Sequence, residues 1–317
     1  MRVDSNYINN PNYFDLLIVG GGPAGLAAAV YAKRANLKVA FIEKDAPGGK
    51  VVKTAFVENY PGFSSISGPD LAMNFFKQVS ELNVKYIYGN VTNISKLDDI
   101  FHVTTEDGMI RFSKTVIIAT GMTERKIGVP GEKEYYGRGV SYCAICDAAI
   151  YKNKPVAVIG GGNTAIEESI YLADIVSKVY LIHRRDAFRA DEIVVQKAKA
   201  NSKIEFLLDT VPKSFDGDGK KIVGITVENV KTKVETKIEV DCIFPFVGFL
   251  PVTESVAKFD IKDQNGFVKT NSRMETAVPG LFSAGDVNSK DFRQISTAVA
   301  DGTIAALEAK KYLEENQ

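Results

Sequence analysis

The stretch Tyr13–Arg34, YFDLLIVGGGPAGLAAAVYAKR, predicts the fold of the first part of the chain. Its apolar beginning is typical of a buried parallel strand, and its end, Leu26–Arg34, is an alanine-rich helical segment. The G-x-G-x-x-G between them, in this strand-to-helix context, predicts a dinucleotide-binding unit whose helix N-terminus faces the phosphates. The glycines make the tight turn, admit the pyrophosphate and allow close packing of helix on strand. The candidate binding residues are Gly20, Gly22, Pro23, Ala24 and Gly25.

An acidic residue and two glycine-bearing turns follow this unit. The strand predicted at Leu37–Ile42 ends at Glu43, whose carboxylate can accept hydrogen bonds from ribose hydroxyls. The turns Pro47–Lys50 and Val57–Gly62 come soon afterwards. They indicate a chain wrapped closely round an extended ligand, and ordinary loops are the alternative.

The next segments complete the first unit. Ser67–Glu81 predicts an amphipathic helix, and Tyr86–Phe112, broken by Asp107-Gly108, predicts a small antiparallel meander. Thr115–Thr120 predicts another buried strand, which ends at Gly121.

A second unit repeats this order. Pro155–Ile159 predicts a strand that enters GGGNTA, Gly160–Ala165, and a helix at Ile166–Leu172. Alanine replaces the third glycine, which the fingerprint tolerates. A further strand is predicted at Lys178–Ile182. The candidate binding residues here are Gly162, Asn163 and Thr164.

Basic residues stand where the first unit has its acid. His183 follows Ala165 at the spacing at which Glu43 follows Gly25, and Arg184, Arg185 and Arg189 come after it. A carboxylate would repel a ribose phosphate, whereas guanidinium groups bind one in bidentate fashion. The pattern therefore predicts a preference for NADPH over NADH. A solvated basic strand end is the alternative.

The sequence CAICD, Cys143–Asp147, opens the second unit. Two thiols at this spacing can close a small disulfide ring, and a helix N-terminus at the first sulfur would favour its thiolate. Asp147 can exchange a proton with a departing thiolate. Half of a zinc site and two inert thiols are the alternatives. The other usual nitrogen and sulfur donors are only Cys242, His102 and His183, so we expect no metal site.

The remaining strands extend the repeat. Ile204–Val240 alternates polar and apolar residues, and Asp241–Val247 closes at Gly248 as Thr115–Thr120 closes at Gly121. Within it, Cys242 is expected to be a buried, inert thiol. Near the C-terminus, the strand in Gly280–Asp286 and the helix at Ser296–Tyr312 either help to bind the first ligand or simply cover a core.

Composition narrows the function classes. A chain of 317 residues suits two domains, and its zero net charge gives no indication of nucleic-acid binding. No apolar run has membrane-spanning length, and the polar segment Met1–Asn12 is expected to be a loose extension rather than a signal peptide or an anchor. Three cysteines fit a reducing compartment, and with two histidines in all we expect no Ser-His-Asp device.

Taken together, these segments resemble the low-molecular-weight, bacterial-type thioredoxin reductases from Phe14 onward. GGGPAG, VENYPG, ATG, CAICD, GGGNTAIEE, HRRDAFRA, GLFSAGD and RQI occur in that family's order. The resemblance implies an α/β fold with two Rossmann-like, three-layer ββα-type domains. It implies an NADPH domain at 124–247 inserted into an FAD domain split into 1–123 and 248–317. It also implies a cytoplasmic homodimer whose protein substrate is thioredoxin.

The resemblance also implies residue roles. Those expected to contact FAD, besides the first glycine loop, are Glu43, Gly49, Lys50, Asn59, Val91, Gly121, Gly285, Asp286, Arg293, Gln294 and Ile295. NADPH is expected at the second glycine loop, with His183 near it and Arg184, Arg185 and Arg189 on the 2′-phosphate. Cys146 is implied to face the flavin, Cys143 to attack the substrate disulfide, and Asp147 to protonate the leaving thiolate.

Some features leave alternatives open. Lys50 stands where the family usually has glutamine, so it either contributes only its backbone or places a cation that tunes the flavin. The dithiol and the nicotinamide belong to one domain and must reach the same flavin, which implies domain rotation with hinges near Thr123–Lys126 and Gly248–Pro251.

Two other functions remain as alternatives. A flavin reductase serving ferredoxin or a quinone would not need the C-x-x-C, and a redox sensor would have no turnover.

Overall fold

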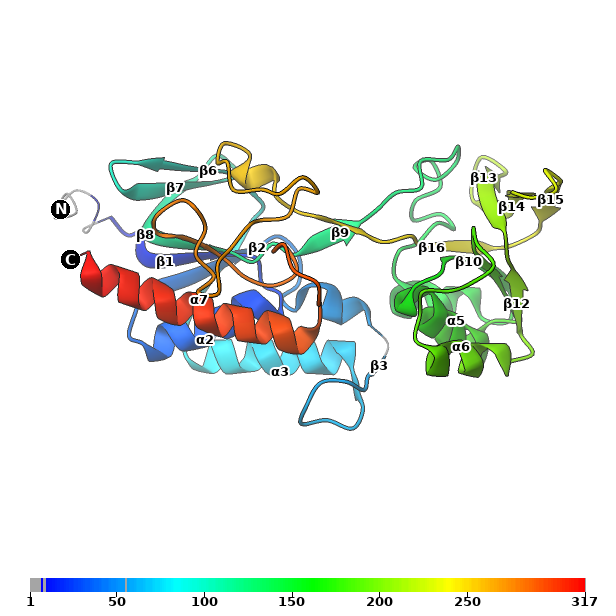
Figure 1. The fold of residues 1–317 in the computed structure, drawn as a ribbon, viewed down its shortest axis with the longest axis horizontal. Helices are drawn as coiled ribbons and strands as arrows, with labels where there is room; N and C mark the ends of the chain where they lie inside the picture. Colours follow the sequence, from blue (N-terminus) through cyan, green and yellow to red (C-terminus); the bar gives the residue numbers. More distant parts are fainter. Residues whose placement is uncertain (1–6, 8–9, 55, 317) are drawn as a thin grey trace. The chain divides into compact units, whose positions relative to one another are not determined.

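The chain forms two compact units in the computed structural model, which describes residues 7, 10–54 and 56–316 (Figure 1). Unit 1 comprises the described residues up to Val52, Phe56–Thr123 and the chain from Pro251 onward. Unit 2 comprises Lys53 and Thr54 together with Glu124–Leu250. The segment Met1–Asn12, for which we expected a loose extension, lies largely outside the described residues.

Unit 1 is built on a seven-stranded sheet with the order β5-β2-β1-β8-β7-β6, and β18 pairs with β8. Strands β5, β2, β1, β8 and β18 are parallel, whereas β6, β7 and β8 form an antiparallel meander. The strands are β1 (Tyr13–Val19), β2 (Val39–Glu43), β5 (Lys85–Tyr88), β6 (Val91–Leu97), β7 (Ile100–Thr105), β8 (Ile110–Ile118) and β18 (Leu281–Ser283).

Alternate residues of β1 pack on opposite faces of this sheet. Leu16 and Ile18 belong to the core that includes the helices, and Leu17 and Val19 belong to the core on the meander side. A strand buried on both faces has a continuous apolar sequence, which explains the run before the first glycine loop. Figure 1 shows three helices along one side of the sheet: α2 (Pro23–Arg34), α3 (Gly68–Glu81) and α7 (Ile295–Glu315). Unit 1 also contains β3 (Phe56–Val57), β4 (Ile66–Ser67), η3 (Glu254–Val256) and all of η1 (Gly49–Lys53) except its last residue, which belongs to unit 2.

The predicted meander was partly wrong. Its first part, β5, pairs in parallel with β2, for example Phe41 with Tyr86, and only β6–β8 are antiparallel. Polar–apolar alternation measures which faces of a strand are buried and does not reveal the direction of its neighbour. Helix α2 begins three residues earlier than predicted, because Pro23 has the φ angle that a first helical position requires.

Unit 2 contains a parallel sheet with the order β12-β11-β10-β16 and a separate antiparallel sheet, β13-β14-β15. Along β10, Val156 and Val158 pack towards the helices, and Ala157 and Ile159 pack towards the antiparallel sheet. The parallel strands are β10 (Pro155–Gly160), β11 (Lys178–Ile182), β12 (Ile204–Leu207) and β16 (Cys242–Phe246). The remaining elements are α4 (Ala144–Asp147), η2 (Ala148–Tyr151), α5 (Asn163–Ile175), α6 (Glu192–Lys199), β13 (Thr210–Gly217), β14 (Ile222–Asn229) and β15 (Glu235–Ile238).

Two of the points at which the chain passes from one unit to the other lie in β9 (Met122–Glu124) and β17 (Phe249–Pro251), which pair as a two-stranded sheet. At one end of the pair the Arg125 amide donates to the Gly248 carbonyl, and at the other the Val252 amide donates to the Gly121 carbonyl. These are the segments in which we expected hinges.

A buried carboxyl group on α5 gives unit 2 a pH-dependent stability. Glu168 is 8% exposed, its Oε2 finds no hydrogen-bond partner in the described part of the chain, and burial raises its pKa to about 7. Below the unfolded pKa near 4.5 the group is neutral in both states, and above about 7 it is charged in both. Stability is therefore lost as the pH rises between these values.

We expect Glu168→Gln, which keeps the side-chain volume and removes the charge, to abolish this loss. The stability gain of the variant over the native chain should grow from about pH 5 to about pH 7 and then level off. Above about pH 7, the free energy of unfolding of the variant should exceed that of the native chain by the order of 3 kcal/mol. Urea unfolding across this pH range measures it, and a difference independent of pH would contradict the prediction.

Candidate redox and nucleotide-binding sites

The first glycine loop joins β1 to α2 and presents an open helix N-terminus. Gly22 is the N-cap of α2, and among the described residues no side chain caps the helix there. An added Cβ at Gly25 would lie 1.9 Å from the Gly20 carbonyl oxygen, so only glycine allows this approach of helix and loop. The first N–H groups of α2 therefore remain available to an anion such as a pyrophosphate.

Glu43 lies beside this loop at the end of β2. Its Oε2 accepts a hydrogen bond from the Gly21 amide at 2.7 Å, and its Oε1 accepts one from the Asp45 amide at 2.9 Å. An open pocket of about 470 Å³ starts directly beyond Glu43, lined by Lys44, Asp45, Tyr88, Gly89, Asn90, Thr105, Glu106 and Asp107. Val91, another predicted contact, follows Asn90 at the start of β6.

The turn at Pro47–Lys50 packs against the glycine loop, as expected for a chain that wraps a ligand. The Gly48 amide donates to the Gly21 carbonyl at 2.7 Å, and a Cβ on Gly49 would lie 3.0 Å from the Gly22 Cα. The next residue, Lys50, forms an ion pair with Asp286, with 3.3 Å between Nζ and Oδ2.

The candidate residues near the C-terminus lie beside the first glycine loop. From sequence alone, their segments could either help to bind the first ligand or simply cover a core. A Cβ on Gly285 would lie 2.9 Å from the Ala24 Cβ, which sets the end of β18 against the start of α2. The Asn59 amide donates to the side-chain oxygen of Gln294 at 3.3 Å, just before α7. Arg293 donates from Nε to the Asp286 carbonyl at 3.3 Å. Of the other two candidates, Ile295 begins α7 and packs on the cluster round Val51, and Gly121 lies at the β9 end of unit 1.

The second glycine loop repeats the open helix N-terminus. Gly162 is the N-cap of α5, again with no capping side chain in the part that the structure describes. Asn163 is turned towards the start of α6, because its amide donates to the Asp191 carboxylate at 2.9 Å and its oxygen accepts from the Asp191 backbone at 2.7 Å. Thr164 is exposed beside it.

The basic turn after β11 folds back on this loop. His183 is buried, its ring would lie 2.1 Å from a Cβ on Gly161, and it stacks on Phe188 with 5.1 Å between the ring centroids. The Arg189 amide donates to the Gly161 carbonyl at 2.8 Å. Burial lowers the pKa of His183, and the neighbouring arginines lower it further, so the ring is neutral near pH 7. The anchored turn leaves three exposed guanidinium groups close to the open helix: Arg184, Arg185 and Arg189.

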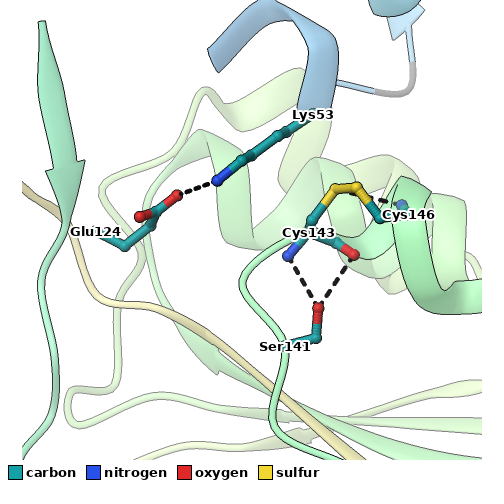
Figure 2. The surroundings of a disulfide bond; sticks show 5 residues. All are labelled: Lys53, Glu124, Ser141, Cys143 and Cys146. Carbon is teal, nitrogen blue, oxygen red and sulfur yellow. Dashed lines mark hydrogen bonds and ion pairs between the residues drawn. A yellow bond between two sulfur atoms is a disulfide. The ribbon is translucent and has the colours of Figure 1, made fainter. Parts of the chain in front are cut away.

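The two cysteines of the C-x-x-C are joined in a disulfide, as their spacing predicted (Figure 2). Cys143 is the N-cap of α4, and its Sγ accepts a hydrogen bond from the Cys146 amide at 3.2 Å. Ser141 holds the backbone of Cys143, since its Oγ accepts from the Cys143 amide at 3.1 Å and donates to the Cys143 carbonyl at 3.2 Å. Cys143 is only 8% exposed, whereas Cys146 is exposed, and Asp147 is half-buried at the end of α4.

Two observations concern possible metal ligands and the third cysteine. No group of three or more histidine, cysteine or acidic side chains that could hold a metal occurs among the described residues. Cys242 is fully buried in β16, where burial raises the pKa of its thiol, as expected for an inert cysteine. Across the same described part of the chain, no helix has the length and apolar character that crossing a membrane would need.

An ion pair that the sequence did not predict lies near the disulfide. Lys53 Nζ donates to Glu124 Oε1 at 2.9 Å, and Figure 2 shows the pair beside Cys143 and Cys146. Partial burial works to raise the pKa of Glu124, but the bond from Lys53 and the charge of Lys126 outweigh it, and the pKa is lowered. No motif contains either residue, and the only local signal was that Glu124 begins the predicted inserted domain.

Known proteins are similar to this chain over nearly its whole length. The family model described as pyridine nucleotide-disulphide oxidoreductase matches residues 14–302. The chain is 45% identical to the thioredoxin reductase of Mycoplasma pneumoniae over 99% of this chain and 100% of the relative. It is 42% identical to that of Bacillus subtilis over 96% of each chain. The crystal structure of Lactococcus lactis thioredoxin reductase in its FR conformation is 45% identical, with a TM-score of 0.92 over 95% of this chain and 99% of that one.

Proposed function

The chain belongs to the thioredoxin reductases of the pyridine nucleotide-disulphide oxidoreductase family, and from this premise we propose that it reduces the disulfide of a thioredoxin with electrons from NADPH. One observation carries the proposal: the Cys143–Cys146 disulfide belongs to the same unit as an open glycine loop with three guanidinium groups. A dithiol and a phosphate-selective nucleotide site on one chain are what NADPH-dependent disulfide reduction requires.

FAD fits unit 1, because that unit offers an uncapped helix N-terminus for the pyrophosphate and a carboxylate for the ribose. Bound there, FAD would supply two-electron transfer between the nicotinamide and the disulfide. We assign its contacts to the first glycine loop, Glu43, the Gly49–Lys50 turn, Asn59, Val91, Gly121 and the segments Gly285–Asp286 and Arg293–Ile295. The hydrogen bonds and close approaches that join most of them support this assignment.

NADPH fits unit 2 for the same reason, with arginines in place of the acid. We assign the 2′-phosphate to Arg184, Arg185 and Arg189, and the pyrophosphate to Gly162, Asn163 and Thr164 at the start of α5. His183 supports the turn as a buried neutral ring, and this holds the backbone that carries the three arginines.

The different exposure of Cys143 and Cys146 indicates which thiol can reach the substrate. The family resemblance implies Cys143, yet Cys143 is buried and Cys146 is exposed. We therefore propose that the Cys146 thiolate attacks the thioredoxin disulfide and forms a mixed disulfide, while Asp147 protonates the departing thiolate. Cys143 then attacks Cys146 Sγ, which re-forms the ring and releases the second thioredoxin thiolate. The hydrogen bond from the Cys146 amide suits Cys143 to hold negative charge until then.

We further propose that unit 2, the NADPH domain, rotates about the segments 123–126 and 248–251 between the two half-reactions, and that the enzyme is a cytoplasmic homodimer. The paired strands β9 and β17 support these segments as the hinge, because each strand is short and carries a chain crossing. The family resemblance and the few cysteines support the assembly and the compartment.

Steady-state kinetics with a thioredoxin and a chromogenic disulfide test the proposed function. We expect turnover with NADPH to require thioredoxin, and NADH to serve at least about a hundredfold less well, as loss of charge-assisted bonds to a phosphate implies. A reaction without thioredoxin is the control. Oxidation of NADPH only with ferredoxin or a quinone would indicate another flavin reductase, and the absence of turnover would indicate a sensor.

A further inference from the structure

Tyr142, the residue directly before the disulfide, is held at both its hydroxyl group and its ring. The side chain is only 8% exposed, and its hydroxyl donates to Glu132 Oε1 at 2.5 Å. The ammonium group of Lys126 lies 3.4 Å from the centroid of the Tyr142 ring. Burial and the bond to Glu132 both raise the pKa of Tyr142, so its hydroxyl remains a donor throughout the working pH range.

The acceptor of this bond is itself fixed. Glu132 is 5% exposed, and besides Tyr142 it accepts from the Ile127 amide at 3.0 Å and from the Gly128 amide at 2.6 Å. A buried carboxylate with three donors is a rigid support, because moving it would break several charge-assisted bonds at once.

The backbone that leads to Cys143 is also fixed on its other side. Val140 bridges to Ile243 of β16, and the Ser141 amide donates to the Ile243 carbonyl at 3.1 Å. Glu132, Lys126 and β16 therefore hold the chain up to the peptide bond before Cys143. The disulfide ring begins at a point with little conformational freedom.

We propose that Tyr142 is a positioning residue for the redox disulfide, whose attachment to Glu132 and Lys126 favours the closed ring over the open dithiol. The proposal rests on the proposed function in so far as this disulfide turns over. The reasoning is entropic. An anchored Cys143 gives up little freedom when its sulfur bonds to Cys146, so the two thiols behave as though each were at high effective concentration. When the anchor is removed, Cys143 gains conformational freedom only in the open dithiol, because the closed ring still restrains it. The disulfide therefore becomes easier to reduce.

The variant Tyr142→Phe removes the hydroxyl and keeps the ring. Glu132 retains its two backbone donors in this variant, so no buried charge loses all its partners. We expect the equilibrium between the Cys143–Cys146 disulfide and the dithiol to move towards the dithiol by about threefold to tenfold. A tenfold change equals about 30 mV for this two-electron couple. The holoenzyme is equilibrated in dithiothreitol redox buffers, and alkylation with mass spectrometry reads the state of this pair.

Tyr136→Phe is the matched control, because it makes the same chemical change in the same cluster. The Tyr136 ring lies 6.0 Å from the Tyr142 ring and 5.4 Å from Lys126, but it is 65% exposed. We expect the redox potential of the Cys143–Cys146 pair in Tyr136→Phe to equal that in the native chain. Lys126→Met, at an exposed position that leaves folding intact, should shift the equilibrium in the same direction as Tyr142→Phe, and Lys126→Arg should restore it.

Two results would overturn the proposal. One is a Tyr142→Phe or Lys126→Met enzyme with the native equilibrium, and the other is an equal shift in Tyr136→Phe. The measurement needs neither NADPH nor thioredoxin. A native protein that exchanges with dithiothreitol but fails to reduce thioredoxin would refute the proposed function and leave this comparison intact.

Discussion

Replacing Cys146 by serine should abolish thioredoxin reduction, lowering kcat/KM for thioredoxin by at least about a thousandfold. A serine hydroxyl at neutral pH neither attacks a disulfide nor forms the ring with Cys143. The slow oxidation of NADPH by oxygen should continue, because it requires the nucleotide sites and no dithiol. Steady-state assays with thioredoxin and with oxygen alone measure the two rates on one preparation.

The corresponding change at Cys143 separates the roles of the two sulfurs. Cys143→Ser should also stop turnover, but its remaining Cys146 thiol is exposed and should form a stable mixed disulfide with a thioredoxin that lacks its second cysteine. Cys146→Ser should form far less of this adduct, since Cys143 is buried and serves as the N-cap of α4. Non-reducing electrophoresis and mass spectrometry identify the adduct.

The third cysteine provides the control for both variants. Cys242 lies fully buried in β16, and burial raises the pKa of its thiol, so Cys242→Ala should retain native turnover. Normal turnover by Cys146→Ser would refute the assigned disulfide. Adduct formation by Cys146→Ser alone would return the attacking role to Cys143, as the family resemblance implies.

Local chemistry explains how much of the fold could be predicted from sequence. In both units an apolar strand, a glycine loop and a helix follow one another within a short stretch, and each step has its own residue requirement. Gly25 illustrates this, because an added Cβ would meet the Gly20 carbonyl oxygen. The disulfide was predictable for the same reason, since both cysteines lie in one turn of chain.

Contacts between distant segments could not be predicted in this way. Lys53 donates to Glu124 although the two residues are far apart in sequence, and no local feature of either residue predicts this contact. Tyr142 and Glu132 are closer in sequence, but their bond depends on how β16 and the chain before Cys143 pack. The different exposure of Cys143 and Cys146 likewise depends on tertiary packing, which the spacing of a motif does not contain.

The basic turn after β11 decides the choice between the two nicotinamide nucleotides, and removing its charges should abolish the preference for NADPH. The double variant Arg184→Ala/Arg185→Ala should lower kcat/KM for NADPH by the order of a hundredfold, since each charge-assisted bond contributes about 1.5–3 kcal/mol. It should leave kcat/KM for NADH within about threefold of the native value. The turn itself should survive, because the buried His183 ring and the Arg189 amide hold it to Gly161.

Three further measurements make this prediction specific to the ribose phosphate. Lys199→Ala removes an exposed cation from α6 of the same unit and should change neither nucleotide's kinetics. Raising the salt concentration should weaken NADPH binding to the native enzyme more than to the double variant, because only the native site attracts the phosphate by charge. Transfer from the dithiol to thioredoxin should be unchanged in the double variant, since the arginines act before that step. Equal losses with NADPH and NADH would mean that the arginines support the turn rather than recognise the phosphate.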